Sequence, residues 1–148
     1  MISKILVPTD GSKAAQKAAL FAVDLAKQLK ASISALCVID KRMFVAKTVP
    51  AAKAPRHTPE TIEDYLNEAA QKYVDAVKTL CDERHVEYRV AIKMGYPVDE
   101  IVKEAKRAKA NLIVMGSRGR SALSATVMGS VSYGVVHHAQ NVPVLVVK

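Results

Sequence analysis

The sequence predicts an α/β fold, an open five-stranded parallel β-sheet with helices on both of its faces. Two observations carry this prediction. Short apolar runs alternate with amphipathic helical periodicity along the 148 residues, in the order β-α-β-α-β-α-β-α-β, which is typical of parallel sheets with crossover helices. The run LIVM at residues 112–115 is continuously apolar, as a strand is when both faces of a parallel sheet are covered. We expect one domain over residues 1–148.

The first elements are marked by clear start and stop signals. Residues 5–7 predict a short strand that ends at Pro8 and the turn-forming sequence TDGS at 9–12. Between residues 15 and 29, Ala and Leu recur at steps of three and four, the spacing of one helix face. Residues 33–39 alternate loosely and predict the second strand.

A basic segment follows the second strand. Residues 41–59 contain five Lys or Arg residues, three prolines and no acid, which favours an irregular loop with reason to approach phosphate. Thr58 before Pro59 is typical of an N-cap with proline at the first helical position. Apolar residues at helical spacing over 62–80 then predict a long amphipathic helix.

The second half of the chain predicts three strands and two helices. A strand over 86–94 turns at 95–97 into a helix with an apolar face over 98–105, and the strand at 112–115 ends at Gly116. A last helix over 130–139 is expected to direct four side chains inward: Val131, Val135, Val136 and Ala139. The final strand is expected between Val142 and Val147.

Composition restricts the class of protein. No apolar run approaches the ~18 residues that a membrane helix needs, and no basic and apolar leader precedes Ile5, so we expect a soluble, cytoplasmic chain. Cys37 and Cys81 lie in separate apolar segments and are expected to be buried, with neither a redox pair nor a metal site. The formal charge of +8 favours anionic partners. The alternative is that the basic residues only keep the surface solvated.

The loop after the fourth strand has an unusual glycine spacing. Gly116 is followed by Gly119 after two residues, and Gly129 and Ser130 follow after nine more and open the last helix. Backbone amides at a helix N-terminus favour an anion, and glycine lets a ligand approach them closely. This spacing indicates a phosphate-binding loop in which Ser130 caps the helix or contacts phosphate. For each residue taken alone, the alternative is a purely structural role. Gly116 and Gly119 would then only form a tight turn, and Ser130 would only cap the helix. Neither GxGxxG nor GxxxxGK[ST] occurs.

The run MGSRGRSALSATVMGSVS resembles the signature G-x2-G-x9-G-[ST] of ATP-binding universal stress proteins. KILVPTDGS, CVID, NLIVMGSRGRS and NVPVLVV also fall where that family places them, so the likeness covers the whole chain. It implies a Rossmann-like sheet of the adenine nucleotide α-hydrolase type with strand order 3-2-1-4-5. It also implies bound ATP, with Mg or Mn held through the phosphates, and a homodimer. We expect the dimer to form through the apolar last strand, between Val142 and Val147.

The resemblance also assigns the cofactor-binding residues. Pro8, Thr9 and Asp10 should border adenine and ribose, with Val38 touching adenine through its main chain. Met115 and Gly116 should flank the ribose. Gly119, Gly129, Ser130 and Val131 should hold the phosphates. Arg118 and Ser132 are also expected among the cofactor-binding residues.

Catalytic residues are not evident. Asp10 is the one carboxylate placed at the site, where it either makes the turn, accepts a ribose hydroxyl or binds a divalent ion through water. A hydrolase needs a base to orient the attacking group, so we expect very slow or no ATP hydrolysis. Arg118 and Arg120 are the residues that would neutralise developing charge on a triphosphate.

Three functions remain open at this stage. The first is an ATP-binding regulator of the stress response. The second is an enzyme related to the adenosine-nucleotide α-hydrolases, which usually carry an SGGxDS-type loop where this chain has PTDGSKAA. The third is a basic nucleic-acid-binding module, which the absence of Trp and the presence of only two Phe make unlikely.

Overall fold

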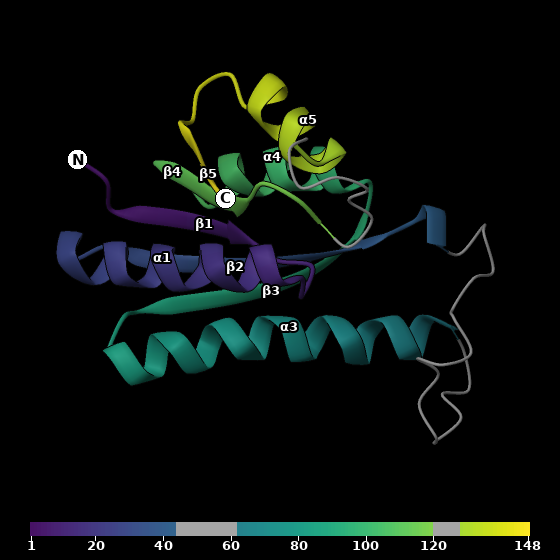
Figure 1. Ribbon diagram of the computed structural model, residues 1–148, viewed down its shortest axis with the longest axis horizontal. Coiled ribbons are helices and arrows are strands. Elements are labelled where there is room, and N and C mark those ends of the chain that lie inside the picture. The colour runs from purple at the N-terminus through teal and green to yellow at the C-terminus, as the bar shows by residue number, and fades with distance from the viewer. Residues whose placement is uncertain (44–61, 120–127) are drawn as a thin grey trace.

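The computed structural model describes residues 1–43, 62–119 and 128–148. Its five strands form one parallel sheet in the order β3-β2-β1-β4-β5, which confirms the predicted fold class and strand order (Figure 1). The elements, in chain order, are β1 (Lys4–Pro8), α1 (Lys13–Leu29), β2 (Ser32–Asp40), α3 (Ile62–Arg84), β3 (Tyr88–Gly95), α4 (Pro97–Arg107), β4 (Leu112–Gly116), α5 (Ser130–His138) and β5 (Val144–Val147).

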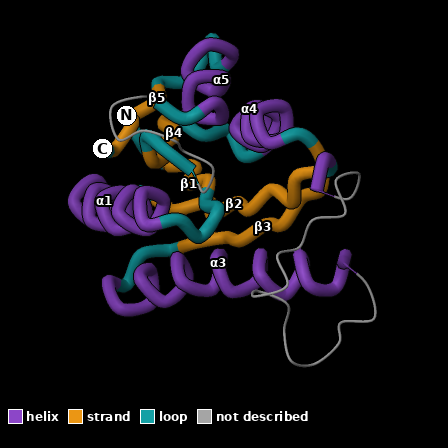
Figure 2. The backbone as a smooth tube through the Cα atoms, turned by 45° about the vertical axis from the view of Figure 1, so that its right-hand side comes forward, coloured by secondary structure: helices purple, strands orange, loops and turns teal. Residues whose placement is uncertain are grey.

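Among the described residues, two helices cover each face of the sheet. Helices α1 and α3 lie on one side of it, and α4 and α5 lie on the other (Figures 1 and 2). Because side chains alternate along a strand, Ile5 and Val7 of β1 point into the layer under α1 and α3, whereas Leu6 points toward α4 and α5. All three side chains are fully buried. This two-sided burial explains why the central strands are continuously apolar.

Helix α1 lies close to the sheet because its inner face is built from alanine. Ala18, Ala22 and Ala26 are 0% exposed, and their small side chains permit a short distance between helix and strands. Ser12 caps the helix by accepting a hydrogen bond from the Ala15 N–H at 3.1 Å. The helix face predicted from residues 15–29 is thereby confirmed.

Three details differ from the sequence prediction. Strand β3 begins at Tyr88 rather than Val86, whose N–H instead closes the end of α3 by donating to Cys81 O. Strand β5 begins at Val144, after Pro143, which has no N–H for the ladder. Val136 is 47% exposed rather than inward, because Val135 is 0% exposed on the buried face of this short helix and the next residue is turned about 100° away from it.

Some of the predicted features lie outside the residues that the structure describes. The basic segment at 41–59 lies outside the described residues beyond Met43, as do Thr58, Pro59 and Arg120. Cys37 and Cys81 are buried in the interior, as expected. Among the described helices, none has the length and apolar character required to cross a membrane.

Candidate functional site

The strand order reverses between β1 and β4. From β1 the chain continues to β2 and β3 on one side, and it then crosses to β4 and β5 on the other. In open α/β sheets a crevice forms outside the carboxyl ends of the strands at such a point. The segments that border it are the turn at residues 9–12 after β1 and residues 117–119 after β4.

The turn after β1 is ordered by its own side chains. The Thr9 N–H donates to Leu36 O at 2.8 Å, the last hydrogen bond between this chain segment and β2. Thr9 Oγ1 accepts the Gly11 N–H at 3.2 Å, and Asp10 Oδ1 accepts the Ser12 N–H at 2.9 Å. Gly11 has a φ of +76°, a left-handed conformation that a residue with a Cβ adopts only at a cost. Asp10 is therefore held in a defined turn at the start of α1.

The end of β4 lies directly against the first turn of α1. A Cβ at Gly116 would be 2.7 Å from the carbonyl carbon of Ala14 and 2.9 Å from its oxygen. These are backbone atoms that have no room to move aside, so the close approach requires glycine. Met115, one residue earlier, is buried at 5% exposure and packs on the α4 and α5 side of the sheet.

Asp10, Gly119 and Gly129 converge at the crevice. A Cβ at Gly119 would lie 2.7 Å from Asp10 Oδ2, so the carboxylate after β1 meets the backbone of the loop after β4. A Cβ at Gly129 would lie 3.3 Å from Arg118 Cα and 3.4 Å from Gly119 N. The Gly129 N–H donates to Ser117 O at 2.6 Å. The two ends of the glycine signature are thus in contact.

The two serines of α5 have different environments. Gly129 is the N-cap and makes no side-chain capping bond, while Ser130 is the first, exposed residue of the helix. The prediction that Ser130 caps α5 is therefore wrong, because the helix begins at Ser130 itself. Ser132 is 3% exposed, and its hydroxyl donates to Gly116 O at 2.6 Å. Val131 is partly buried against the α4 and α5 layer.

The helix N-termini at this edge differ in charge. Helices α3 and α4 each have two acidic residues in the first turn, whereas α1 and α5 have none. Acidic side chains stabilise the positive end of a helix dipole. The two helices without them are those that begin after β1 and after the β4 loop, on either side of the crevice. Their N-termini are consequently suited to an external anion.

Strand β2 extends past the end of β1. Pro8 pairs with Leu36, so residues 37–40 continue beyond the last pair. The Ile33 N–H donates to Glu87 O, just before β3, and Leu36 O accepts from Thr9 on the β1 side. Main-chain groups alternate in direction along a strand, so those of Val38, two residues after Leu36, face the crevice side. Asp40 at the end of β2 is bound to Arg42, whose hydrogen bonds and positive charge hold the pKa of that carboxyl below its ordinary value.

The described residues contain no group of three or more His, Cys, Asp or Glu side chains able to hold a metal ion. Arg118 is partly exposed on the loop beside Gly119. Tyr73 and Gln16 were not predicted as site residues, yet both contact the turn after β1. Helical spacing predicts that Tyr73 faces inward, but no sequence signal indicates which loop it meets.

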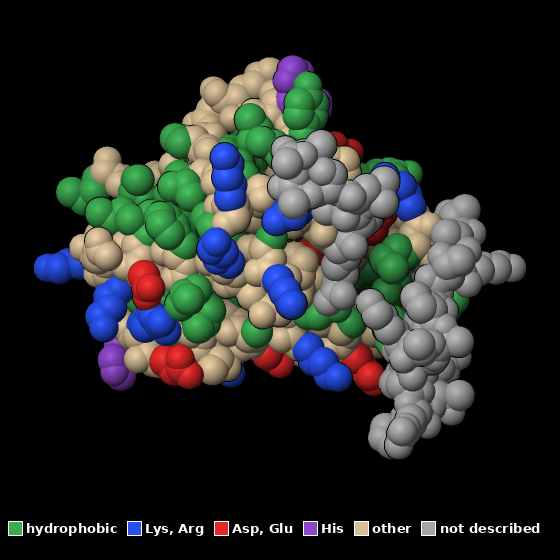
Figure 3. All heavy atoms as spheres, viewed as in Figure 1, with side chains coloured by type: hydrophobic (Ala, Val, Ile, Leu, Met, Phe, Trp, Pro, Cys, Tyr) green, Lys and Arg blue, Asp and Glu red, His purple; other side chains and the backbone are tan. Residues whose placement is uncertain are grey.

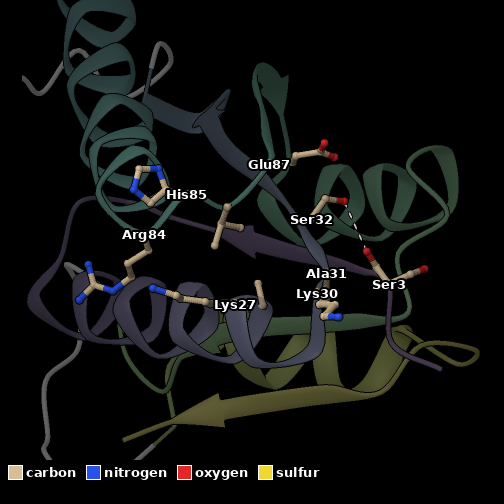
Figure 4. Close-up of a pocket in the computed structure, with 10 residues that line it drawn as sticks. Ser3, Lys27, Lys30, Ala31, Ser32, Arg84, His85 and Glu87 are labelled. Carbon is tan, nitrogen blue, oxygen red and sulfur yellow. Dashed lines mark hydrogen bonds between the residues drawn. The ribbon is translucent and has the colours of Figure 1, made fainter.

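An open hollow of about 400 Å³ lies at the opposite, amino edge of the sheet (Figure 4). Its walls come from the C-terminal ends of α1 and α3 and from the starts of β2 and β3. In Figure 4, Lys27 and Arg84 lie at one side of it and Ser3 and Ser32 at the other, and Glu87 points away from them. These side chains do not converge on a common point, and helix C-termini disfavour anions.

The comparisons with known proteins agree on one family. The model of the universal stress protein family matches residues 1–148. Universal stress protein MJ0531 of Methanocaldococcus jannaschii is 37% identical over 148 residues, which cover 100% of this chain and 83% of that protein. Universal stress protein YxiE of Bacillus subtilis is 33% identical over 149 residues and is matched over the full length of both chains.

Solved structures show the same architecture. The structure of MJ0577, also from Methanocaldococcus jannaschii, has a TM-score of 0.71 and 29% identity and covers 100% of this chain and 96% of that one. Two further structures share the fold at lower identity. One is a universal stress protein in complex with cAMP, with a TM-score of 0.63, 24% identity and coverage of 99% and 96%. The other, from Archaeoglobus fulgidus in complex with dAMP, has a TM-score of 0.69, 20% identity and coverage of 100% and 98%.

The strand order, the glycine-lined crevice and a family match over every residue lead to the same conclusion: the chain belongs to the universal stress protein family.

Proposed function

We propose that this protein binds ATP in the crevice between β1 and β4 and acts as a nucleotide-dependent regulatory protein of the stress response. The observation that carries the proposal is the contact of Asp10 with Gly119 and of Gly129 with the same loop. This contact lies between two helix N-termini that have no acid in their first turns. Phosphate is the ligand group that such amide-rich, positive surroundings favour.

The triphosphate would lie on the loop at 117–119 and on the first turn of α5. Gly119 and Val131 offer main-chain amides there, and Ser130 offers an exposed hydroxyl. The Gly129 N–H is engaged with Ser117 O at 2.6 Å, so Gly129 would contribute by leaving the phosphate room to approach this loop. Arg118 stands on the same loop and supplies positive charge. Ser132 has a different role in this proposal, because its hydroxyl is engaged with Gly116 O. Ser132 would hold α5 against Gly116, the residue from which the phosphate loop continues.

The nucleoside would occupy the side of the crevice formed by β1 and β2. The main chain of Val38 faces that space beyond the last pair of β1 and β2. Adenine would use these main-chain groups, with Pro8 and Thr9 at its border, and Gly116 and Met115 would flank the ribose. Asp10 would accept a ribose hydroxyl bond with its carboxylate, which the turn already orients.

A divalent ion, Mg or Mn, would be held through the phosphates. Magnesium sites commonly combine one or two carboxylates with phosphate oxygens and water, and Asp10 is the carboxylate that the described residues place at the crevice. The sequence on either side of Asp10, KILVPTDGSKAAQ, contains no second acid as a base for an attacking water, so slow hydrolysis remains the expectation. The structures solved with cAMP and dAMP support the proposal only in that proteins of this fold accommodate an adenine nucleotide.

An adenylate-transferring enzyme and a nucleic-acid-binding module remain the alternatives. The first needs a catalytic group beside Asp10. The second needs a continuous basic surface, whereas the Lys and Arg side chains on the face shown in Figure 3 are scattered among acidic and neutral ones. Neither alternative has an observation in its favour among the described residues.

Two matched variants at Ser130 test phosphate binding. Glu and Gln have the same shape, and an acid at this first helical position stabilises the helix by about 0.3–1 kcal/mol. We expect Ser130→Glu to weaken ATP binding by at least tenfold relative to Ser130→Gln in isothermal titration calorimetry, without loss of thermal stability. Equal ATP affinities for the two variants would contradict the proposed phosphate position.

We also propose a homodimer through β5 and a cytoplasmic location. Strand β5 is an edge strand of four apolar residues, all partly exposed, and an apolar edge invites pairing with a second copy. The other edge strand, β3, carries the exposed Arg89, a charge that opposes such pairing. The free thiols of Cys37 and Cys81 suit a reducing compartment.

A further inference from the structure

An aromatic side chain of α3 packs against the turn that carries Asp10. A Cβ at Gly11 would lie 2.2 Å from Cε1, 2.3 Å from Cδ1 and 2.6 Å from Cζ of Tyr73. The tyrosine ring therefore rests on the Cα of Gly11 and occupies the space that any larger residue would need. Tyr73 itself is partly buried beside a core cluster that includes Cys37 and Val74. This core cluster thus helps to hold the ring of Tyr73 in place.

Gly11 is fixed from a second direction. The Gln16 side-chain amide, one turn into α1, donates from Nε2 to Gly11 O at 3.1 Å. Gly11 also adopts a φ of +76°, so its conformation is set by contacts on both sides. Because Gly11 follows Asp10 directly, and because Asp10 Oδ1 accepts the Ser12 N–H on its far side at 2.9 Å, a shift of Gly11 moves the carboxylate.

The position of Asp10 matters because the loop after β4 meets it. Asp10 Oδ2 lies 2.7 Å from where a Gly119 Cβ would be. A displacement of a few tenths of an ångström would change this contact and the direction in which the carboxylate points. The chain of contacts therefore runs from Tyr73 to Gly11, from Gly11 to Asp10, and from Asp10 to the glycine loop.

We propose that Tyr73 is a positioning residue for the nucleotide site, which sets the Asp10 carboxylate by packing its ring on Gly11. This inference rests on the proposed function. Tyr73 acts on the nucleoside half of the ligand, since Asp10 is the group that would accept the ribose hydroxyl. The phosphate half depends on Gly119, Gly129 and Ser130, and the contacts described connect Tyr73 to Gly119 through Gly11 and Asp10. The three atoms nearest to the Gly11 Cβ position are ring carbons, so the packing on Gly11 depends on the ring.

The test compares ATP with inorganic triphosphate, which has no nucleoside. In calorimetric titrations without a divalent ion, Tyr73→Ala should weaken ATP binding roughly tenfold, a typical coupling for residues in contact, and weaken triphosphate binding by less than about threefold. Tyr73→Phe keeps the ring that packs on Gly11 and should bind ATP more tightly than Tyr73→Ala does. Tyr65→Ala is the matched control, because Tyr65 is a partly buried tyrosine of the same helix and the same core cluster. It should lower stability but not ATP affinity. If Tyr73→Ala fails to fold, Tyr73→Leu keeps most of the volume, lacks the flat ring and is expected to weaken ATP binding in the same direction.

A double-mutant cycle separates positioning from general packing. If Tyr73 acts through Asp10, replacing it in an Asp10→Asn background should cost little further ATP affinity. Independent, additive losses would overturn the inference, and so would parent-like ATP binding by Tyr73→Ala or an equal loss in Tyr65→Ala. A parent protein that binds triphosphate but not ATP, or neither, overturns the proposed function and the inference with it, which distinguishes the two failures.

Discussion

Ser132 makes the buried hydrogen bond that joins α5 to the end of β4. Its hydroxyl donates to Gly116 O at 2.6 Å, and its side chain is 3% exposed. Ser132→Ala leaves that buried carbonyl without this donor, which costs about 1–3 kcal/mol of unfolding free energy. Urea denaturation measures the change. Ser130→Ala is the control, because Ser130 is exposed and makes no capping bond, so its stability should stay within about 0.5 kcal/mol of the parent. Equal losses in both variants would contradict the assignment.

The Cys81 thiol gives a pH-dependent contribution to stability. Burial raises the pKa of Cys81 to about 11, and the negative charge of Asp82 acts in the same direction. An unfolded thiol ionises at about 8.5, so the unfolded chain releases this proton first. The contribution is present below pH ~8.5 and is lost as the pH rises toward the folded pKa.

We therefore expect the unfolding free energy of the parent to fall more steeply with pH than that of Cys81→Ala. Between pH 8.5 and pH 10 the difference should reach about 2 kcal/mol, since each pKa unit corresponds to about 1.4 kcal/mol. All other ionisable groups are common to the two proteins and cancel in the comparison. Parallel pH profiles for the two proteins would show that the Cys81 thiol is not protected by the fold.

At the scale of elements, β5 has one row of main-chain groups with no strand of the described residues beside it. Pro143 O and Val147 O accept hydrogen bonds from Ile113 and Ser117, each at 2.9 Å. Because main-chain groups alternate in direction along a strand, those of Val144 and Val146 point away from β4. These are the groups that a second copy of β5 would pair with.

Val146→Pro removes one outward N–H and leaves the ladder between β4 and β5 intact. We expect the parent to sediment as a dimer and Val146→Pro to sediment as a monomer with a similar far-ultraviolet spectrum. Val146→Thr keeps the N–H and serves as the control, which should remain dimeric. A monomeric parent at micromolar concentration, or a dimeric proline variant, would refute pairing through β5.

The sequence predicted the elements well because their physical signals are local. Buried strands such as 112–115 are apolar on both faces, and the alanine face of α1 repeats at helical spacing. The strand order came from the family resemblance. Val136 was misplaced because a short run of valines does not define which side of α5 meets α4. The contact of Tyr73 with Gly11 joins residues 62 positions apart, and no periodic pattern reports such a pairing.

The glycine spacing was informative about the candidate site for a different reason. Gly116 and Gly119 stand where backbone or carboxylate atoms leave no room for a Cβ, so the requirement is visible in the residue type. Residue type alone could not distinguish the roles of the two serines. Ser130 and Ser132 are both small and polar, and only the orientation of α5 buries one and exposes the other.

At the scale of the whole molecule, the two edges of the sheet offer different surfaces. The carboxyl edge combines the glycine loops with the N-termini of α1 and α5. The amino edge holds the hollow between the C-terminal ends of α1 and α3, with Lys27, Lys30 and Arg84 among its residues. The excess of basic residues gives the chain a formal charge of +8, which attracts an anion to either edge. The net charge therefore does not distinguish the two edges, and the local geometry determines which of them binds ATP.

The most direct test is an NMR titration of ¹⁵N-labelled protein with magnesium ATP, read residue by residue. We expect the largest amide shifts at residues 9–12, 116–119 and 129–131, together with Val38, and small shifts at Lys30, Ser32 and Glu87 around the amino-edge hollow. Saturating shifts centred on that hollow, or none at the carboxyl edge at millimolar ATP, would show that the crevice between β1 and β4 is not the nucleotide site.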